Sequence, residues 1–300
     1  MVAHATLDQL AGTAPWPKIS LVTPVFNSAR YLDEAMSSVL DQGYPNLEYI
    51  LVDGGSTDGS LDIIRKHSSR LRWYTSEPDQ GMYDALNKGF AHSSGEIMGW
   101  ISATDKLHPG GLFVVGSVFR DLSDVDWITG IPTAFDEQGS VIRVAKLRRW
   151  TRGRFLAGAN RYIQQESTFW RRGLWDRAGG HVDASRRMAS DFELWVRFFR
   201  YARLYPVAAR IGGFRVHSDS LGLQELDACH RIQNDIIERE LASNSEMAGI
   251  RLFRRLSACI LGVPALGALW RHTVMSALLR MPGPDQPPVI EYRSRWIQRT

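Results

Sequence analysis

Asp53 is the residue whose type and setting most clearly suit chemistry. It ends the apolar run 49–52, two glycines follow it, and a second acid stands at Asp58. A short apolar run that ends in Asp and Gly is typical of a buried strand leaving its sheet, and Gly54 lets a ligand approach the backbone closely. Asp53 would then lie at the carboxyl end of a strand, where open α/β sheets bind ligands. The simpler interpretation is a strand-to-helix turn with a capping acid.

Two further acids stand in comparable settings. Asp105 follows the strand-like run 97–101. Asp191 stands at the start of the strongly apolar helix expected over 190–199, where the helix dipole and free N–H groups favour a carboxylate. The simpler interpretation of Asp191 is a helix cap.

Alternating strands and helices in the first 120 residues must position these groups. Strands are expected at 18–24, 49–53, 71–76 and 97–101, and helices at 31–40, 61–66, 82–90 and 110–120. A strand–helix–strand order makes neighbouring strands parallel, which predicts the α/β class. Asn27, Asp53 and Asp105 each follow one of these strands, so they could share one edge of the sheet.

The second half of the chain carries shorter strands and a basic segment. Strands are expected at 127–130, 141–144 and 163–170, and the patterned region ends at 212–217. The segment 146–154 is rich in Arg and holds one Trp. It fits a solvated loop and a contact for phosphate or an anionic acceptor equally well.

Charge is unevenly distributed along the 300 residues. The whole chain carries +4, but residues 251–300 hold eight Arg and two acids, a net +6, so the remainder carries −2. The body is therefore not a nucleic-acid surface, and no nucleic-acid partner is expected. The two cysteines, Cys229 and Cys259, form no framework, which suits a reducing compartment such as the cytoplasm.

The chain start and the apolar runs give no sign of membrane insertion. Residues 1–17 lack the basic start and long apolar core of a signal peptide, so a flexible leader is expected. The longest weakly polar run, 256–270, is shorter than the ~20 residues that a spanning helix needs.

Taken as a set, these motifs resemble the family 2 glycosyltransferases. The resemblance rests on Thr23–Asn27, Val52–Gly59, Asp79–Gly81, Asn87–Gly89 and Asp105, and 165–169 and 190–195 fit the acceptor half of that family. It covers roughly 18–217. It implies a GT-A fold, in which a Rossmann-like nucleotide half with a mostly parallel sheet is fused to an acceptor half. The chain would then divide into a leader (1–17), a GT-A domain (18–222) and a basic helical extension (223–300).

The resemblance also assigns the donor, a nucleoside diphosphate sugar. Asp53 would bind the base, and the backbone of Pro24, Val25 and Asn27 would line the same pocket. The other nucleotide-site residues would be Gly54, Asp79, Gly81 and Asn87.

By the same resemblance Asp105 would hold Mn²⁺ or Mg²⁺ on the donor diphosphate, because hard cations prefer oxygen ligands. The family usually has further acids in this motif, whereas this chain has Ser102 and Thr104, so metal affinity without nucleotide should be low. His217 is a second candidate ligand; its alternative is a structural role.

Inversion at the sugar carbon needs a base for the acceptor hydroxyl, and Asp191 matches the family's base position. Gln165 and Glu166 would bond acceptor or donor sugar, or have a structural role. Trp170 and Trp195 are expected in core packing rather than on sugar faces.

The sequence thus predicts an inverting glycosyltransferase of polysaccharide or glycolipid assembly, with a saccharide or lipid-linked acceptor. Residues 251–280 mix Arg with apolar residues, so they could contact the inner face of an anionic membrane, or form a packing arm or dimer contact. The alternatives are a nucleotide-sugar-binding module that has lost turnover, as Thr104 would suggest, and a nucleotidyltransferase, whose Gly-rich basic signature is absent. The Gly-x-Gly-x-x-Gly of a dinucleotide oxidoreductase is also absent.

Overall fold

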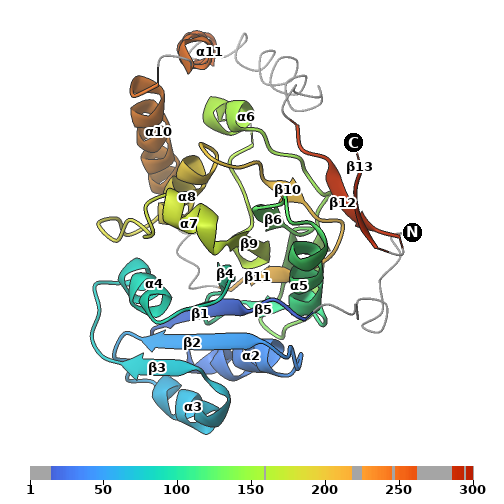
Figure 1. Cartoon of the computed structure of the whole chain (residues 1–300). Helices are drawn as coiled ribbons and strands as arrows, with labels where there is room; N and C mark the ends of the chain where they lie inside the picture. Colours follow the sequence, from blue (N-terminus) through green and yellow to red (C-terminus); the bar gives the residue numbers. More distant parts are fainter. Residues whose placement is uncertain are drawn as a thin grey trace.

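The computed structural model describes residues 15–158, 160–217, 225–244, 247–261, 286–293 and 295–299 (Figure 1). In this part of the chain the largest sheet has seven strands, in the order β10-β6-β9-β4-β1-β2-β3. They are β1 (Ile19–Val25), β2 (Leu47–Asp53), β3 (Trp73–Ser76), β4 (Ile97–Trp100), β6 (Trp127–Thr129), β9 (Thr168–Arg171) and β10 (Tyr205–Pro206). The expected α/β class with a mostly parallel sheet is confirmed.

The register of the sheet brings three strand ends to one edge. β1 runs parallel to β2 and to β4, with Val25 opposite Asp53 and Val22 opposite Trp100. β3 continues the parallel set, whereas β9 is antiparallel to both β4 and β6. The loops that follow β1, β2 and β4 therefore leave the sheet on the same side, as the sequence predicted.

β1 continues to Val25, although the sequence indicated an end at Pro24. Proline cannot donate a ladder hydrogen bond. β4 pairs with β1 only as far as Val22, so the position of Pro24, which faces the β4 side, lies beyond that ladder. The strand therefore tolerates proline here without losing a bond.

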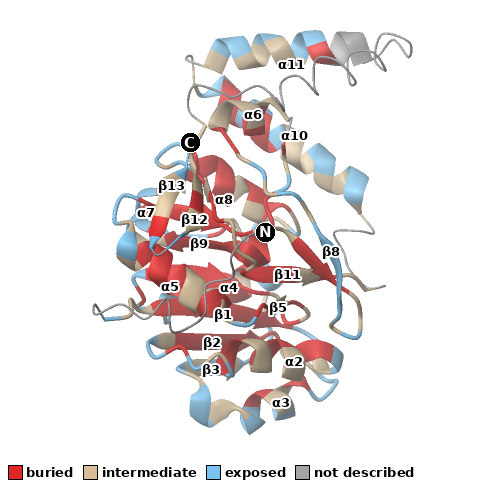
Figure 2. Ribbon diagram, turned by 90° about the vertical axis from the view of Figure 1, so that its right-hand side faces the viewer, coloured by how far each residue is buried: buried red, intermediate tan, exposed pale blue. Residues whose placement is uncertain are grey.

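Helices cover both faces of the sheet. They are α2 (Ala29–Leu40), α3 (Ser60–Lys66), α4 (Met82–Ala91), α5 (Gly111–Asp121), α6 (Arg152–Ala157), α7 (Arg172–Arg177), α8 (Ser190–Phe198), α10 (Leu226–Ala242) and α11 (Ala248–Leu261). Alternate strand residues face opposite ways: Leu21 and Leu51 join the core with α2 and α5, whereas Val22 and Ile50 join the core with α4, α7 and α8. Figure 2 shows the sheet buried between these layers.

Aromatic side chains fill the core beneath α8. Trp195 is stacked between Trp100 and Trp127, with ring centroids 5.6 Å and 5.4 Å away. Trp170 is completely buried and meets Trp195 edge to face. The expectation that Trp170 and Trp195 pack in the core is confirmed.

A smaller sheet lies against the carboxyl edge of the large one. Its order is β5-β11-β7-β8, made of β5 (Lys106–Leu107), β7 (Thr133–Phe135), β8 (Val141–Val144) and β11 (Gly212–Arg215). β11 pairs antiparallel with β5, which starts directly after Asp105. This pairing brings a segment more than a hundred residues away in sequence to the candidate metal carboxylate.

Three sequence-based expectations about elements need correction. The stretch 163–170 is not one strand, because Gln165–Ser167 forms a 3₁₀ turn before β9. Part of the basic segment forms α6, whose N-cap Thr151 accepts a hydrogen bond from the Arg154 N–H at 3.3 Å. The C-terminal extension is not helical throughout, because β12 (Val289–Tyr292) and β13 (Trp296–Arg299) form a hairpin.

Two contacts with the main body hold the β12–β13 hairpin in place. The Trp296 indole N–H donates to Ser117 Oγ of α5 at 2.7 Å, and Ile290 bridges Val207 beside β10. The strands β12 and β13 are therefore attached to the main body.

Among the helices in the described ranges, none is both long and apolar enough to cross a membrane. Of the segment predicted to contact a membrane, 262–280 lies outside the described residues. The predicted leader lies outside them as far as residue 14. Those expectations stay predictions, as do the domain boundaries.

Candidate active site

Asp53 ends β2 as a completely buried carboxylate. Its oxygens accept hydrogen bonds from the Ser56 N–H at 3.1 Å, from the Ser76 hydroxyl at 2.6 Å and from the Ser56 hydroxyl. These bonds fix the carboxylate at the strand end and stabilise the turn that follows. Both the capping interpretation and a fixed nucleotide contact are compatible with this arrangement.

Gly54 explains how the next loop reaches Asp53. A Cβ atom on Gly54 would lie 2.7 Å from Oδ2 of Asp79. A glycine at this position therefore leaves room for the Asp79 carboxylate to pack against the backbone directly after Asp53. Oδ1 of Asp79 in turn accepts the Gly81 N–H at 2.7 Å, and Gly81 has a φ of 112°. The structure thus brings together Asp53, Gly54, Asp79 and Gly81, four residues that the sequence assigned to one site.

Asn27 connects the first two loops. Its amide oxygen accepts the Thr57 N–H at 2.9 Å, and its own N–H donates to Ser56 Oγ at 2.8 Å. It adopts a φ of 45°, a left-handed conformation that Asn tolerates better than most residues. Its neighbour Phe26 is 64% exposed, a large apolar surface beside the nucleotide-site loops that the sequence reasoning did not single out.

Pro24 and Val25, also assigned to the nucleotide pocket, are buried inside β1. The Val25 carbonyl oxygen accepts the Gly54 N–H at 2.8 Å. Their contribution is therefore to the position of the strand end, from which Phe26 and Asn27 emerge.

Asp105 is buried at the opposite side of this edge, after β4. One of its oxygens accepts the Arg215 N–H at 2.7 Å, and its carboxyl group interacts electrostatically with that of Glu166. Desolvation, followed by the charge of Glu166, raises the pKa of Asp105 well above its usual value. Desolvation likewise raises the pKa of Glu166, so burial and the mutual repulsion of the two carboxyl groups disfavour ionising both at once.

This pair of acids fits a divalent cation. Oε2 of Glu166 is buried and has no hydrogen-bond partner, so one oxygen beside Asp105 is available as a ligand. In the described part of the chain no three or more His, Cys, Asp and Glu side chains gather closely enough to hold a metal. The expected low metal affinity without nucleotide stays a prediction.

His217 lies two residues beyond β11, beside Tyr31, with ring centroids 5.3 Å apart. Its assignment as a second metal ligand stays a prediction. Glu166, which the sequence assigned to sugar binding, is the residue that contacts Asp105.

Arg215 holds the Asp105 loop in place. Its side chain is fully buried, its Nε donates to the Thr104 carbonyl oxygen at 2.6 Å, and its Nη2 donates to Glu34 at 2.6 Å. Nη1 donates to two further carbonyl oxygens of the turn after β7, each at 3.1 Å. No local sequence pattern indicates this contact, because it depends on β11 pairing beside β5.

We expect Arg215→Met to lower the free energy of unfolding by about 3–5 kcal/mol, because a buried charged network loses a partner. Urea denaturation measures the change. Arg30→Met is the matched control: Arg30 pairs with Glu137 at 2.6 Å, but its side chain is 62% exposed, so the loss should stay below about 1 kcal/mol. Equal losses for the two variants would contradict the role given to Arg215.

Asp191 lies half-buried in the first turn of α8. Desolvation raises its pKa, and the N–H of Phe192 opposes this shift. Ala189, the N-cap residue, has a φ of 64°, a left-handed conformation that costs a non-glycine residue about 1–2 kcal/mol. A carboxylate with a raised pKa at a strained turn is typical of a functional group rather than of a simple cap.

Asp191 belongs to the same neighbourhood as the Asp105–Glu166 pair. Its charge contributes to the raised pKa of Glu166, after desolvation. Desolvation and then Glu166, Asp105 and Asp191 also raise the pKa of Tyr162, whose side chain is 57% exposed. Tyr162 is thus an exposed aromatic residue beside all three acids, which sequence reasoning missed because it stands in an irregular segment.

Helix α4 supports the loop that precedes Asp191. The Asn87 amide donates to the Val182 carbonyl oxygen and accepts the Val182 N–H, both at 2.8 Å. The Tyr83 hydroxyl accepts the Ser190 N–H at 3.3 Å. Asn87, which the sequence assigned to the nucleotide, therefore directs its amide toward this loop and positions the α8 start.

Gln165 is also engaged within the protein, where its amide donates to the Trp100 carbonyl oxygen. Its neighbour Gln164 bonds the backbone of Thr133 on both sides, accepting the N–H at 2.8 Å and donating to the oxygen at 2.7 Å. These bonds tie the 3₁₀ turn to β4 and β7 and thereby place Glu166 beside Asp105.

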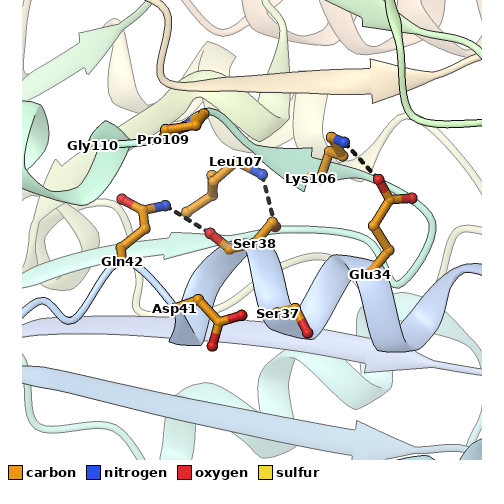
Figure 3. A pocket seen from close by; sticks show the side chains of 9 residues that line it. All are labelled: Glu34, Ser37, Ser38, Asp41, Gln42, Lys106, Leu107, Pro109 and Gly110. Carbon is orange, nitrogen blue, oxygen red and sulfur yellow. Dashed lines mark hydrogen bonds and ion pairs between the residues drawn. The ribbon is translucent and has the colours of Figure 1, made fainter.

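A pocket of about 420 Å³ lies between α2 and the start of α5, and its lining includes Lys106, the residue after Asp105 (Figure 3). Its wall includes Glu34, which accepts from Lys106 Nζ at 2.6 Å, and Ser38, whose Oγ accepts the Leu107 N–H at 3.0 Å. None of the predicted site residues lines it.

The sequence is similar to those of known bacterial proteins. An uncharacterised glycosyltransferase of Rickettsia typhi is 26% identical over 194 residues, covering 63% of this chain and 61% of that protein. One of Rickettsia felis is 32% identical over 133 residues, 43% of this chain and 22% of that protein. The chain therefore spans less than two thirds of these two relatives.

Solved structures share the fold. TarS residues 1–349 of S. aureus, in complex with UDP, superposes with a TM-score of 0.62 at 16% identity, covering 88% of this chain and 76% of that one. The mannosyltransferase PcManGT of Pyrobaculum calidifontis, in complex with GDP-Man and Mn²⁺, gives 0.55 at 17% identity, covering 89% and 85%. Both likenesses support a GT-A fold.

The family model described as glycosyl transferase family 2 matches residues 20–173, which is half of the chain and holds Asp53, Asp79, Asp105 and Glu166. This chain belongs to glycosyl transferase family 2.

Proposed function

We propose that the protein is an inverting glycosyltransferase that moves a sugar from a nucleoside diphosphate sugar to an acceptor hydroxyl, in polysaccharide or glycolipid assembly. The observation that carries the proposal is the position of Asp191, a carboxylate of raised pKa at a helix start, beside the Asp105–Glu166 pair. A base and a cation site are the two groups that such a displacement needs.

In the proposed reaction each acid has a separate task. Asp53 and the loops around Phe26 and Asp79 hold the nucleotide. Asp105, with Glu166, would hold Mn²⁺ or Mg²⁺, which neutralises the charge that gathers on the departing diphosphate. Asp191 takes the proton of the acceptor hydroxyl as its oxygen bonds to the sugar carbon and the bond from that carbon to the diphosphate breaks.

Proteins of the same fold support the choice of donor class. TarS has been crystallised with UDP-GlcNAc, and PcManGT with GDP-Man and Mn²⁺. Because identity to both is low, we do not transfer a particular base or sugar.

The second candidate is a nucleotide-sugar-binding module without turnover. It is favoured by Thr104, where the family pattern has an acid. Measuring donor hydrolysis in Mn²⁺ separates the two candidates: an enzyme hydrolyses donor slowly without acceptor and loses this in Asp105→Ala, whereas a binding module shows donor binding and no turnover in either protein.

The test of donor class is a thermal-shift panel of UDP-, GDP- and TDP-sugars with and without Mn²⁺. A ligand that binds only the native state raises the melting temperature. We expect one nucleotide class to do so, more strongly with Mn²⁺. No shift with any of them would remove the proposed donor class.

The proposal includes a cytoplasmic location with peripheral contact at the inner membrane face through α11. Leu252 and Leu256 of α11 are 60% and 51% exposed, and Arg255 beside them is exposed too. Flotation with phosphatidylglycerol vesicles tests the contact, comparing wild type with Leu252→Ser. Equal flotation of the two proteins would remove the membrane contact.

A further inference from the structure

Two guanidinium groups meet at one neutral oxygen where α6, α10 and α11 come together. Arg161 Nη2 donates to Asn234 Oδ1 at 2.8 Å, and Arg254 Nη2 donates to the same oxygen at 3.1 Å. Figures 1 and 2 show α6, α10 and α11 gathered at one end of the molecule. Two like charges held by a neutral amide leave positive charge that is not balanced at that point.

The carboxylates nearby balance this charge only in part. Arg254 pairs with Glu238 at 2.9 Å, but the Glu238 side chain is 54% exposed. Glu240, which is almost fully buried, is already paired with Arg152 at 2.7 Å and with Arg200 at 2.5 Å. Within the described ranges Arg161 forms no ion pair, and desolvation and then Arg254 lower its pKa.

Gly158 leaves room for the Arg161 guanidinium next to the end of α6. Gly158 ends α6 with a φ of +83°, and a Cβ atom there would lie 2.7 Å from Arg161 Nη2 and 3.0 Å from its Nε. A side chain at this position would therefore push the guanidinium away from Asn234. The Gly158 N–H closes the helix by donating to the Phe155 carbonyl oxygen at 3.0 Å.

This cluster lies on the Asp191 side of the candidate active site. Arg161 directly precedes Tyr162, the exposed aromatic residue beside the three acids. Cys229 of α10 is in electrostatic reach of both groups: desolvation and then the charge of Asp191 raise the pKa of its thiol, and Arg161 opposes this shift. The acceptor must approach Asp191 to lose its proton, so an anion held by Arg161 would be on the acceptor and not on the donor.

We propose that Arg161 and Arg254 form a binding site for an anionic group, a phosphate or carboxylate, carried by the sugar acceptor. The site would use the planar, fork-like geometry with which guanidinium groups bind such anions. This proposal rests on the proposed function, because it assumes that Asp191 receives the acceptor.

The test is titration calorimetry of the full chain with inorganic phosphate, at saturating Mn²⁺ and the nucleoside diphosphate that stabilises the protein most. The bound nucleotide keeps phosphate out of the donor site. We expect the phosphate Kd to rise about tenfold or more in Arg161→Gln and in Arg254→Gln, because a charge-assisted hydrogen bond is lost. Arg161→Lys keeps the charge and should lie between these variants and wild type.

Arg239→Gln is the matched control, since it removes an exposed arginine elsewhere on α10. Its phosphate Kd should equal that of wild type. Nucleotide binding by each variant shows that the protein is folded and that the donor site works. Phosphate binding that is unchanged in Arg161→Gln, or absent in wild type, would overturn the proposal and favour a purely structural tie between α10 and α11.

A second experiment distinguishes an anion on a lipid headgroup from an anion on a free acceptor. Wild type and Arg161→Gln are floated with phosphatidylglycerol vesicles. Weaker flotation of Arg161→Gln would indicate that the site binds a lipid headgroup. Equal flotation of the two proteins, together with lost phosphate binding in the variant, would indicate that the anion belongs to an acceptor free in solution. If wild type neither bound nucleotide nor hydrolysed donor, the proposed function would be refuted. That result differs from the absence of phosphate binding at Arg161, which refutes only the anion site.

Discussion

Replacing Asp191 with Asn should reduce sugar transfer by about a thousandfold, the contribution of a well-placed general base. Donor binding should stay nearly unchanged, because in the proposed reaction Asp191 contacts the acceptor, and the Asn87 and Tyr83 contacts that hold its loop are retained. The measurement combines transfer to an acceptor panel with donor affinity by calorimetry. Loss of transfer and donor binding together would mean that Asp191 supports the fold and is not the base.

Glu193→Gln is the control for this experiment, because it removes a second acid from the same helix turn. Glu193 is paired with Arg197 at 2.8 Å, so its replacement should lower stability. Transfer should persist, since that ion pair does not involve Asp191. If Glu193→Gln lost transfer as completely as Asp191→Asn, the base assignment would fail.

The pH dependence gives a second check on the base. Because burial raises the pKa of Asp191, the carboxylate that acts as base is formed only as the pH rises through that raised value. Transfer by wild type should therefore increase with pH over this range. Asp191→Asn should lose that dependence, leaving a flat residual rate.

The sequence predicted the arrangement of the first half of the fold because that half depends on local patterns. Apolar runs ending in Asn27, Asp53 and Asp105 indicated parallel strands, and the β1–β2–β4 register confirms that their loops share an edge. Helices such as α4 and α8 followed from apolar spacing within one element. None of these inferences needed knowledge of a distant contact.

The parts that sequence reasoning missed depend on pairing between distant segments. Glu166 meets Asp105 only because β9 runs antiparallel beside β4 and a 3₁₀ turn redirects the chain before it. Arg215 reaches Thr104 only because β11 pairs with β5. No local pattern around these residues carries that information.

Asn87 is an example of a residue whose motif was recognised from the sequence but whose structural role was not. The resemblance to the family 2 glycosyltransferases assigned it to the nucleotide site. In the structure both ends of its amide bond the backbone of Val182, on the loop before Asp191. The sequence of a helix does not show which loop an asparagine side chain on it will contact, so this supporting role is seen only in the structure.

The second large effect is expected at the Asp105–Glu166 pair. Glu166→Gln should weaken Mn²⁺ binding in the presence of nucleotide by about 10–100-fold, and Asp105→Asn should weaken it at least as much. Both substitutions remove a carboxylate oxygen that would contact or orient the cation, while the Asp53 end of the site stays intact. Calorimetry of Mn²⁺ binding at saturating nucleotide measures this change without relying on turnover.

The raised pKa values of Asp105 and Glu166 predict how stability depends on pH. Burial holds the carboxyl pKa of Asp105 above its value in the unfolded chain, so without metal the folded state binds more protons and loses stability as the pH rises above the unfolded value. Wild type without metal should therefore lose melting temperature relative to Glu166→Gln as the pH rises above about 4, the unfolded carboxyl pKa. Added Mn²⁺ and nucleotide should reverse this trend in wild type, because a cation held by Asp105 and Glu166 would favour the ionised carboxylates. If wild type and Glu166→Gln melted in parallel across that range, with and without Mn²⁺, the two carboxyl groups would not be coupled, and Glu166 would have no part in holding the cation.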